Sequence, residues 1–312
     1  MSTYPIVFTS NGTTLAGRIH RPTADLTTRS PVVLVTGSWL TVKEQMADRY
    51  AAELARRGYT AISFDFAGWG GSGGQPRQAE LPERKIADIV AAARYASRLS
   101  WATPGGIGYL GVCASAQYAL AAIAEGAPIR AFASVAGWFH DLASVTPFYG
   151  GTAGVTARLR RAQEATELFL RTGELRTVPA YDPGNDTAGM FLEMDYYGNP
   201  ARGAVPQWRN EMAELSWLPW LTFDGLAAAE SVTVPSLFVH SDGCVFPEHI
   251  QDLRKRLAGP VEMAWGEGAQ TDFYDQPAQV EFAVAAVDAF LRETLGDPGD
   301  AGREPEGRSS GV

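Results

Sequence analysis

The pattern of hydrophobic and polar positions along the chain predicts strands that alternate with helices. The apolar runs are typical of strands buried on both faces, and they occupy 31–36, 60–65, 107–112 and 131–136. Segments between them repeat an apolar residue every three or four positions, as one face of a helix does: 43–57, 86–99 and 114–125. This alternation predicts an α/β fold, a mostly parallel sheet with helices on both faces.

The start of the chain has a different pattern. The β-like runs Tyr4–Thr9 and Thr14–Arg21 flank Asn11-Gly12, a dipeptide that tolerates the positive φ angles of a tight turn. We therefore expect a hairpin at this end.

The alternation stops in the second half of the chain. Residues 141–230 are irregular and rich in Trp, Tyr, Pro and Gly, with one clear helical segment near Val155–Arg171. Strand and helix patterns return at 234–240, 261–265 and 279–295. We therefore predict a core formed by 1–140 and 231–296, a helical cap inserted at 141–230, and a disordered tail at 297–312, which lacks any periodicity.

Composition excludes several classes of partner. The 312 residues carry a net charge of −9 without a basic run, so nucleic acid and anionic membrane surfaces are not expected partners. No apolar run is long enough to span a bilayer, and the first residues lack the pattern of a signal peptide. We expect a cytoplasmic protein that acts on a small molecule. The chain could also form a homodimer.

The strongest chemical signal is the segment Gly111–Ser115, which lies between a predicted strand and a predicted helix. Small residues at its first, fourth and fifth positions fit a sharp strand-to-helix turn, which presents the central side chain at the edge of the sheet. The central residue is Cys113, so we predict a nucleophilic thiol. A buried structural cysteine is the competing interpretation. Ser115 is expected to pack inside the helix.

With this turn, the chain resembles the α/β-hydrolase superfamily, in particular its dienelactone-hydrolase-like and YcjY-like cysteine members. The resemblance covers nearly the whole chain except the tail and rests on four segments: Thr36–Met46, Phe64–Ser72, Gly111–Ser115 and Gln270–Gln276. It implies the α/β-hydrolase fold with an inserted cap. It also implies an oxyanion hole formed by the N–H of Ala114 and an N–H of Ser38 or Trp39.

The resemblance also places the other members of a catalytic triad. Asp242 follows a late strand, where the acid is expected. Gln270 stands where the family has its histidine, and glutamine cannot exchange protons near neutral pH. A cysteine tolerates this loss better than a serine, because part of it is already thiolate and a helix N-terminus lowers the pKa of a thiol. His140, after the strand that follows the turn, is the best substitute base, and His240, Asp272 and Asp275 are further candidates.

Further residues are expected near the same cleft. Cys244 lies beyond Asp242, and the cap supplies aromatic residues such as Tyr149 and Trp208 for substrate binding. No metal site is expected, because Cys244 lacks partners at ligand spacing. The glycine-rich loop Gly68–Gly73 does not open a helix as a dinucleotide site would, so no cofactor is expected.

Three functions fit these residues. The first is hydrolysis of a small, largely apolar ester, lactone or thioester through Cys113. The second is a non-hydrolytic lyase, isomerase, cyclase or acyl-transfer reaction in the same pocket. The third is an inactive homologue that only binds a ligand.

Overall fold

The computed structural model describes residues 1–25 and 27–298, and it is built around one large sheet. The sheet has eight strands in the order β1-β2-β4-β3-β5-β6-β9-β10. Strands β1 (Ser2–Ser10) and β2 (Thr13–Arg21) form the predicted hairpin, and β2 runs antiparallel to β4 (Thr60–Phe64). The remaining strands run parallel to β4: β3 (Ser30–Thr36), β5 (Ala102–Val112), β6 (Ile129–Val135), β9 (Ser236–Gly243) and β10 (Val261–Ala269).

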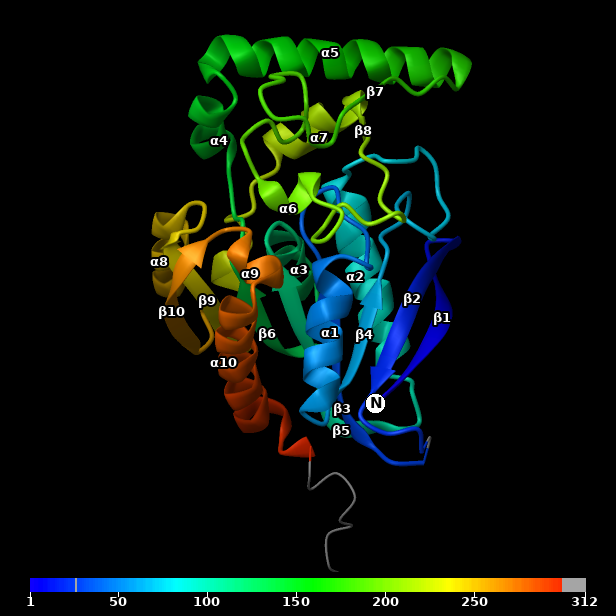
Figure 1. Ribbon diagram of the computed structural model, residues 1–312, viewed down its shortest axis with the longest axis vertical. Coiled ribbons are helices and arrows are strands. Elements are labelled where there is room, and N and C mark those ends of the chain that lie inside the picture. The colour runs from blue at the N-terminus through cyan, green and yellow to red at the C-terminus, as the bar shows by residue number, and fades with distance from the viewer. Residues whose placement is uncertain (26, 299–312) are drawn as a thin grey trace, which may run out of the picture.

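Helices cover both faces of this sheet. On one face lie α1 (Met46–Arg56) and α10 (Pro277–Leu295), which contact each other and, between them, β3, β4, β5, β6, β9 and β10 (Figure 1). On the other lie α2 (Pro82–Ala96) and α3 (Ser115–Ala124), with α8 (Pro247–Arg256) beside β9. Strands β3 and β4 are buried along their whole length, as the continuous apolar runs predict. The predicted α/β fold with a mostly parallel sheet is confirmed.

The segment predicted as a cap contributes no strand to this sheet. Its long helix α5 (Gly151–Thr172) matches the predicted one and crosses the top of the molecule in Figure 1. The other cap elements are short: α4 (Leu142–Phe148), β7 (Thr177–Val178), α6 (Asp195–Gly198), β8 (Met212–Ala213), η1 (Glu214–Ser216), α7 (Trp217–Thr222) and η2 (Ala229–Ser231).

Below the cap, α9 (Asp272–Asp275) follows β10 (Figure 1). Of the predicted tail, residues 299–312 lie outside the described part of the chain. Of the helices described, none combines the length and apolarity needed to cross a membrane.

A buried ion pair connects α2, α3 and the cap. Lys85 Nζ lies 2.7 Å from a carboxylate oxygen of Glu80, and the Tyr118 hydroxyl on α3 donates a hydrogen bond of 2.6 Å to the same carboxylate. The backbone N–H of Glu80 donates to the hydroxyl of Ser216 in the cap at 2.9 Å. Lys85 and Glu80 are both buried, so each charge depends on the other for compensation.

This network predicts that Lys85→Met will destabilise the protein. The substitution leaves the Glu80 carboxylate buried without its cation, which typically costs about 3–5 kcal/mol of unfolding free energy. Urea denaturation measures the loss. The double variant Lys85→Met/Glu80→Gln is the control and should lose less, because no unpaired charge remains. An unchanged unfolding midpoint for Lys85→Met would mean that the pair does not stabilise the junction.

Candidate active site

The predicted sharp turn is present between β5 and α3, and it places Cys113 at the edge of the sheet. Cys113 has a φ of 58°, in the left-handed region that few non-glycine residues adopt. Its N–H donates to the carbonyl of Val135 on the neighbouring strand at 3.0 Å. Gly111 leaves the space this turn needs, since a Cβ there would lie 2.8 Å from Cα of Ala116. Ser115 packs as predicted, with its hydroxyl donating to the carbonyl of Thr36 at 3.1 Å.

Four neighbouring groups favour the ionised form of Cys113. Hydrogen bonding by the backbone N–H groups of Ala114 and Trp39 and by the hydroxyls of Ser38 and Tyr274 lowers the pKa of its thiol. Of the two predicted alternatives for the second N–H, Trp39 is the one that lowers the pKa of Cys113. The N–H of Ser38 donates instead to the sulfur of Met46 at 3.3 Å, although the Ser38 hydroxyl remains beside Cys113.

The thiol is less acidic than sequence reasoning suggests. Burial raises the pKa of Cys113 and outweighs the four donors, which lower it. A helix N-terminus lowers the pKa of a thiol, but Cys113 is only 4% exposed, and the loss of solvent around it has the larger effect. The neutral thiol is therefore the resting form at neutral pH.

Gln270 lies in this site, but its side-chain amide cannot take up or release a proton near neutral pH. Its side-chain N–H2 donates to the carbonyl of Ala136 at 2.7 Å and to the hydroxyl of Tyr274 at 3.1 Å. Its side-chain carbonyl accepts a hydrogen bond of 3.1 Å from the N–H of Val245. The amide is thus held from both ends beside the Tyr274 hydroxyl.

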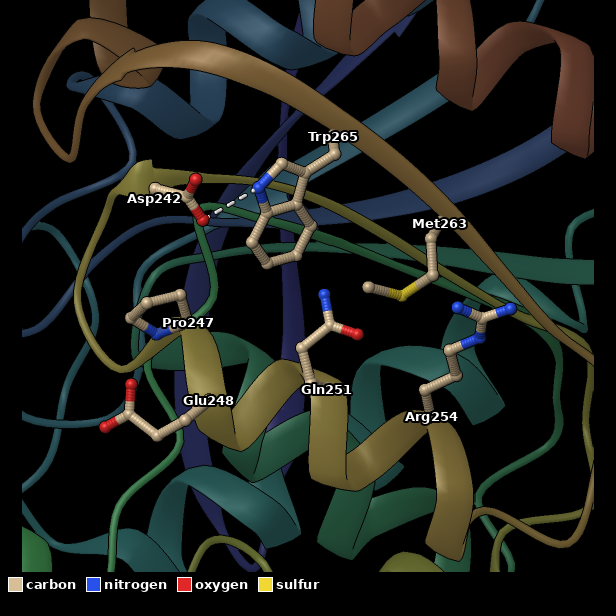
Figure 2. A pocket seen from close by; sticks show the side chains of 7 residues that line it. All are labelled: Asp242, Pro247, Glu248, Gln251, Arg254, Met263 and Trp265. Carbon is tan, nitrogen blue, oxygen red and sulfur yellow. Dashed lines mark hydrogen bonds between the residues drawn. The ribbon is translucent and has the colours of Figure 1, made fainter.

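Asp242 does not join this group, contrary to the triad expectation. It is exposed, and its carboxylate accepts a hydrogen bond of 3.0 Å from the indole N–H of Trp265. Figure 2 shows the two side chains in a surface hollow of about 420 Å³ between β10 and α8, where Gln251 and Arg254 also lie. None of the residues that line this hollow lines the cavity at Cys113.

His140 is not placed to act as the base. It is fully buried, its Nδ1 accepts from the indole N–H of Trp138 at 2.8 Å, and its Nε2 lies 2.8 Å from the carbonyl of Trp220. Both ring nitrogens are therefore engaged in the packing of the cap against the core. Burial lowers the pKa of His140 to about 4. A catalytic histidine and a buried histidine with both ring nitrogens hydrogen-bonded can each follow a strand. The sequence position alone therefore does not distinguish them.

A cavity of about 240 Å³ opens at the sulfur, and half of the residues that line it come from the cap. Tyr149 lines it, as predicted, together with Trp39, Phe191 and Trp220. The lining is mainly apolar and aromatic, so it suits an apolar substrate group.

Two other predicted lining residues lie outside this cavity. Trp208 donates its indole N–H to the carbonyl of Leu40 at 2.7 Å and packs beside Tyr197, so it is a buried contact between cap and core. Cys244 lies behind the wall, where its sulfur accepts a hydrogen bond of 3.3 Å from the Ser241 hydroxyl. Burial raises its pKa to about 11.

Sequence reasoning did not single out the hydroxyls of Tyr274 and Tyr197. Tyr197 donates to the Ser38 hydroxyl at 3.1 Å, and Tyr274 lies 3.4 Å from the same oxygen. The four-residue spacing from Gln270, in the turn before α9, to Tyr274 on α9 is a signal that could have paired these two. No such signal exists for Tyr197, because its cap segment is irregular. Among the described residues, no cluster of three or more His, Cys, Asp or Glu could hold a metal ion.

Comparison with known proteins identifies the family to which the chain belongs. The family model described as X-Pro dipeptidyl-peptidase (S15 family) matches residues 11–173. The uncharacterized protein YcjY of Escherichia coli (strain K12) is 29% identical over 267 residues, which cover 81% of this chain and 85% of YcjY. Acyltransferase drtE of Aspergillus calidoustus is 28% identical over 283 residues, with coverages of 81% and 86%.

A solved structure has the same fold. The α/β hydrolase GrgF from Penicillium sp. sh18 superposes with a TM-score of 0.80 and 19% identity, covering 95% of this chain and 99% of GrgF. The predicted resemblance to YcjY-like α/β-hydrolases is confirmed. Since the family model matches more than half of the chain, this protein belongs to the X-Pro dipeptidyl-peptidase (S15) family of α/β-hydrolases and is an enzyme of the hydrolase type.

Proposed function

We propose that this enzyme takes up the acyl group of a small, largely apolar ester, lactone or thioester on Cys113 and passes it to water. The observation that carries the proposal is the sharp turn that places Cys113 at the start of α3, next to the Ala114 N–H and in the same cavity as Trp39. Donors so placed lie beside any carbonyl that the sulfur attacks. They would stabilise the negative charge that develops on the carbonyl oxygen.

The proposed reaction has two stages. In the first, the sulfur forms a bond to the acyl carbon, the carbonyl oxygen lies against the two N–H groups, and the leaving group departs. In the second, water attacks the resulting thioester and releases the acid. The buried site strengthens each hydrogen bond to the oxyanion, because little solvent screens it.

Transfer to an acceptor other than water is the second candidate. Gln270 favours it, because glutamine cannot activate water as the family histidine does. The similarity to a protein named as an acyltransferase supports the same alternative. A lyase, isomerase or cyclase reaction would use the same cavity. Release of free acid, measured against transfer of the acyl group to added thiols and alcohols, distinguishes hydrolysis from these alternatives.

Covalent trapping tests the role of Cys113. A p-nitrophenyl ester of a short fatty acid should add one acyl group to the wild-type protein, detected by intact-protein mass spectrometry, because its leaving group needs no proton. Cys113→Ala should abolish the adduct, whereas the control Cys244→Ala should retain it. An adduct that persists in Cys113→Ala would refute the nucleophile, and a wild-type protein that is never acylated would favour the ligand-binding alternative.

The cavity predicts which aromatic residues set substrate choice. Phe191→Ala enlarges the cavity and should shift relative kcat/KM towards bulky acyl groups by roughly tenfold. Trp208→Ala, outside the cavity, should leave this ratio unchanged and lower stability by about 3–5 kcal/mol, as loss of a buried tryptophan does. Acyl-chain series and melting curves measure both. The reverse pattern would place the pocket wall at Trp208.

The rate should lack the pH dependence of an imidazole base. His140, with a pKa lowered to about 4, stays neutral above about pH 5, and burial moves the ionisation of Cys113 to higher pH. We therefore expect kcat/KM to be flat between about pH 5.5 and 8, where an ordinary histidine of pKa about 6.5 would titrate. A limb near pH 6.5 that disappears in His140→Ala would contradict this expectation.

A further inference from the structure

The orientation of the Gln270 amide determines where the proton of Tyr274 points. The two ends of this amide face groups of opposite kind, the carbonyl of Ala136 and the N–H of Val245. A flipped amide would set oxygen against oxygen and N–H2 against N–H, so only one orientation is satisfied. In that orientation Gln270 donates an N–H to the Tyr274 oxygen at 3.1 Å.

Tyr274 consequently has its hydroxyl proton free for another acceptor. The Ser38 hydroxyl oxygen lies 3.4 Å from the Tyr274 oxygen and already accepts from Tyr197 at 3.1 Å, and the Cys113 sulfur lines the same cavity as Tyr274. The free proton is therefore available to a leaving atom bound at the sulfur, and the remaining lone pair of the Tyr274 oxygen is available to the thiol proton. Burial raises the pKa of Tyr274 well above its usual value, so the hydroxyl stays neutral.

We infer that Tyr274 is the catalytic proton relay of Cys113 and that Gln270 is the positioning residue that holds it in this role. The inference rests on acylation of Cys113, as proposed above. A hydroxyl can accept one proton while it gives up another, so it moves a proton without becoming charged. The pair would thus replace the missing histidine by a relay that needs no base.

The relay balances the acylation step. The sulfur of Cys113 forms a bond to the acyl carbon, and the bond from that carbon to the leaving oxygen or sulfur breaks. The thiol proton passes to the Tyr274 oxygen while the Tyr274 hydroxyl proton passes to the leaving atom. The products are an acyl thioester on Cys113, a neutral alcohol or thiol, and an unchanged Tyr274. Attack by an acceptor runs the same transfer in reverse and returns a proton to the sulfur.

A carboxylate could also move the proton, but the one that lines the cavity is not placed for this role. Among the described residues lining the cavity, Glu193 carries a carboxylate, but it lies exposed on the cap segment. The side chains that lower the pKa of the Cys113 thiol are those of Ser38 and Tyr274. Tyr274 is the one of these held by an amide whose orientation is determined.

The dependence on leaving group tests the relay. Ethyl hexanoate must leave as a protonated alcohol, whereas p-nitrophenyl hexanoate leaves as a stable anion, and both deliver the same acyl group. Tyr274→Phe should lower kcat/KM for the ethyl ester by about 100-fold or more, the usual contribution of a positioned proton donor. The rate with the p-nitrophenyl ester should fall less than about tenfold, so the ratio of the two rates changes.

Gln270→Met keeps the size of the side chain and removes the N–H that orients Tyr274. Gln270→Met should lower the rate with the ethyl ester selectively, as Tyr274→Phe should. It therefore provides a second test of the relay if one variant folds poorly. Tyr196→Phe is the matched control, because Tyr196 packs edge-on against Tyr274 with ring centroids 5.1 Å apart and lies outside the cavity lining. Its ratio of the two rates should equal that of the wild type.

The outcomes separate this inference from the proposed function. If the wild-type protein is acylated by neither ester, the role of Cys113 itself fails. If it is acylated by the p-nitrophenyl ester alone, or if Tyr274→Phe and Gln270→Met lower both rates equally, the nucleophile stands and the relay is refuted.

Discussion

The strained backbone at Cys113 is the constraint on which the site depends. A φ of 58° at a residue with a side chain is sustained only where the surroundings enforce it. Here the bond from its N–H to the Val135 carbonyl and the close approach of Gly111 to Ala116 enforce it. The turn brings the sulfur, the Ala114 N–H and the loop carrying Trp39 to one point at the edge of the sheet. The cap then closes over that point with aromatic side chains and removes most of the solvent.

Removal of solvent gives the site its chemical character. A nucleophilic thiol is normally paired with a base. Here Gln270 stands where the base is expected, and both its amide oxygen and its amide nitrogen are hydrogen-bonded. The result is a set of neutral groups, because burial raises the pKa values of Cys113, Tyr274 and Tyr197. Acyl transfer in such a site would have to move protons between neutral groups, whether the acceptor is water or another molecule.

Local sequence signals predicted the parts of this arrangement that depend on backbone geometry. Small residues around Cys113 predicted the turn, buried apolar runs predicted the parallel strands, and Asn11-Gly12 predicted the hairpin. Each of these signals acts over a few residues, so it can be read without knowing the rest of the fold.

Side-chain direction in the assembled molecule was harder to predict. Asp242 has the expected position after a strand, but its carboxylate turns to Trp265 on the adjacent strand. Trp208 and His140 also occupy plausible positions, yet contacts with Leu40 and Trp220, distant in the sequence, decide their roles. The residues that line the cavity with Cys113, Tyr274 among them, come from segments that only the folded chain brings together.

We propose that Cys113 carries the acyl group and that the Ala114 and Trp39 N–H groups hold its carbonyl oxygen. A crystal structure of the protein soaked with an activated acyl ester tests this role most directly. We expect continuous density from the sulfur to the acyl carbon, with the carbonyl oxygen about 2.7–3.1 Å from both backbone nitrogens. An ester bound without a covalent bond to Cys113, or an acyl oxygen turned away from both N–H groups, would contradict it.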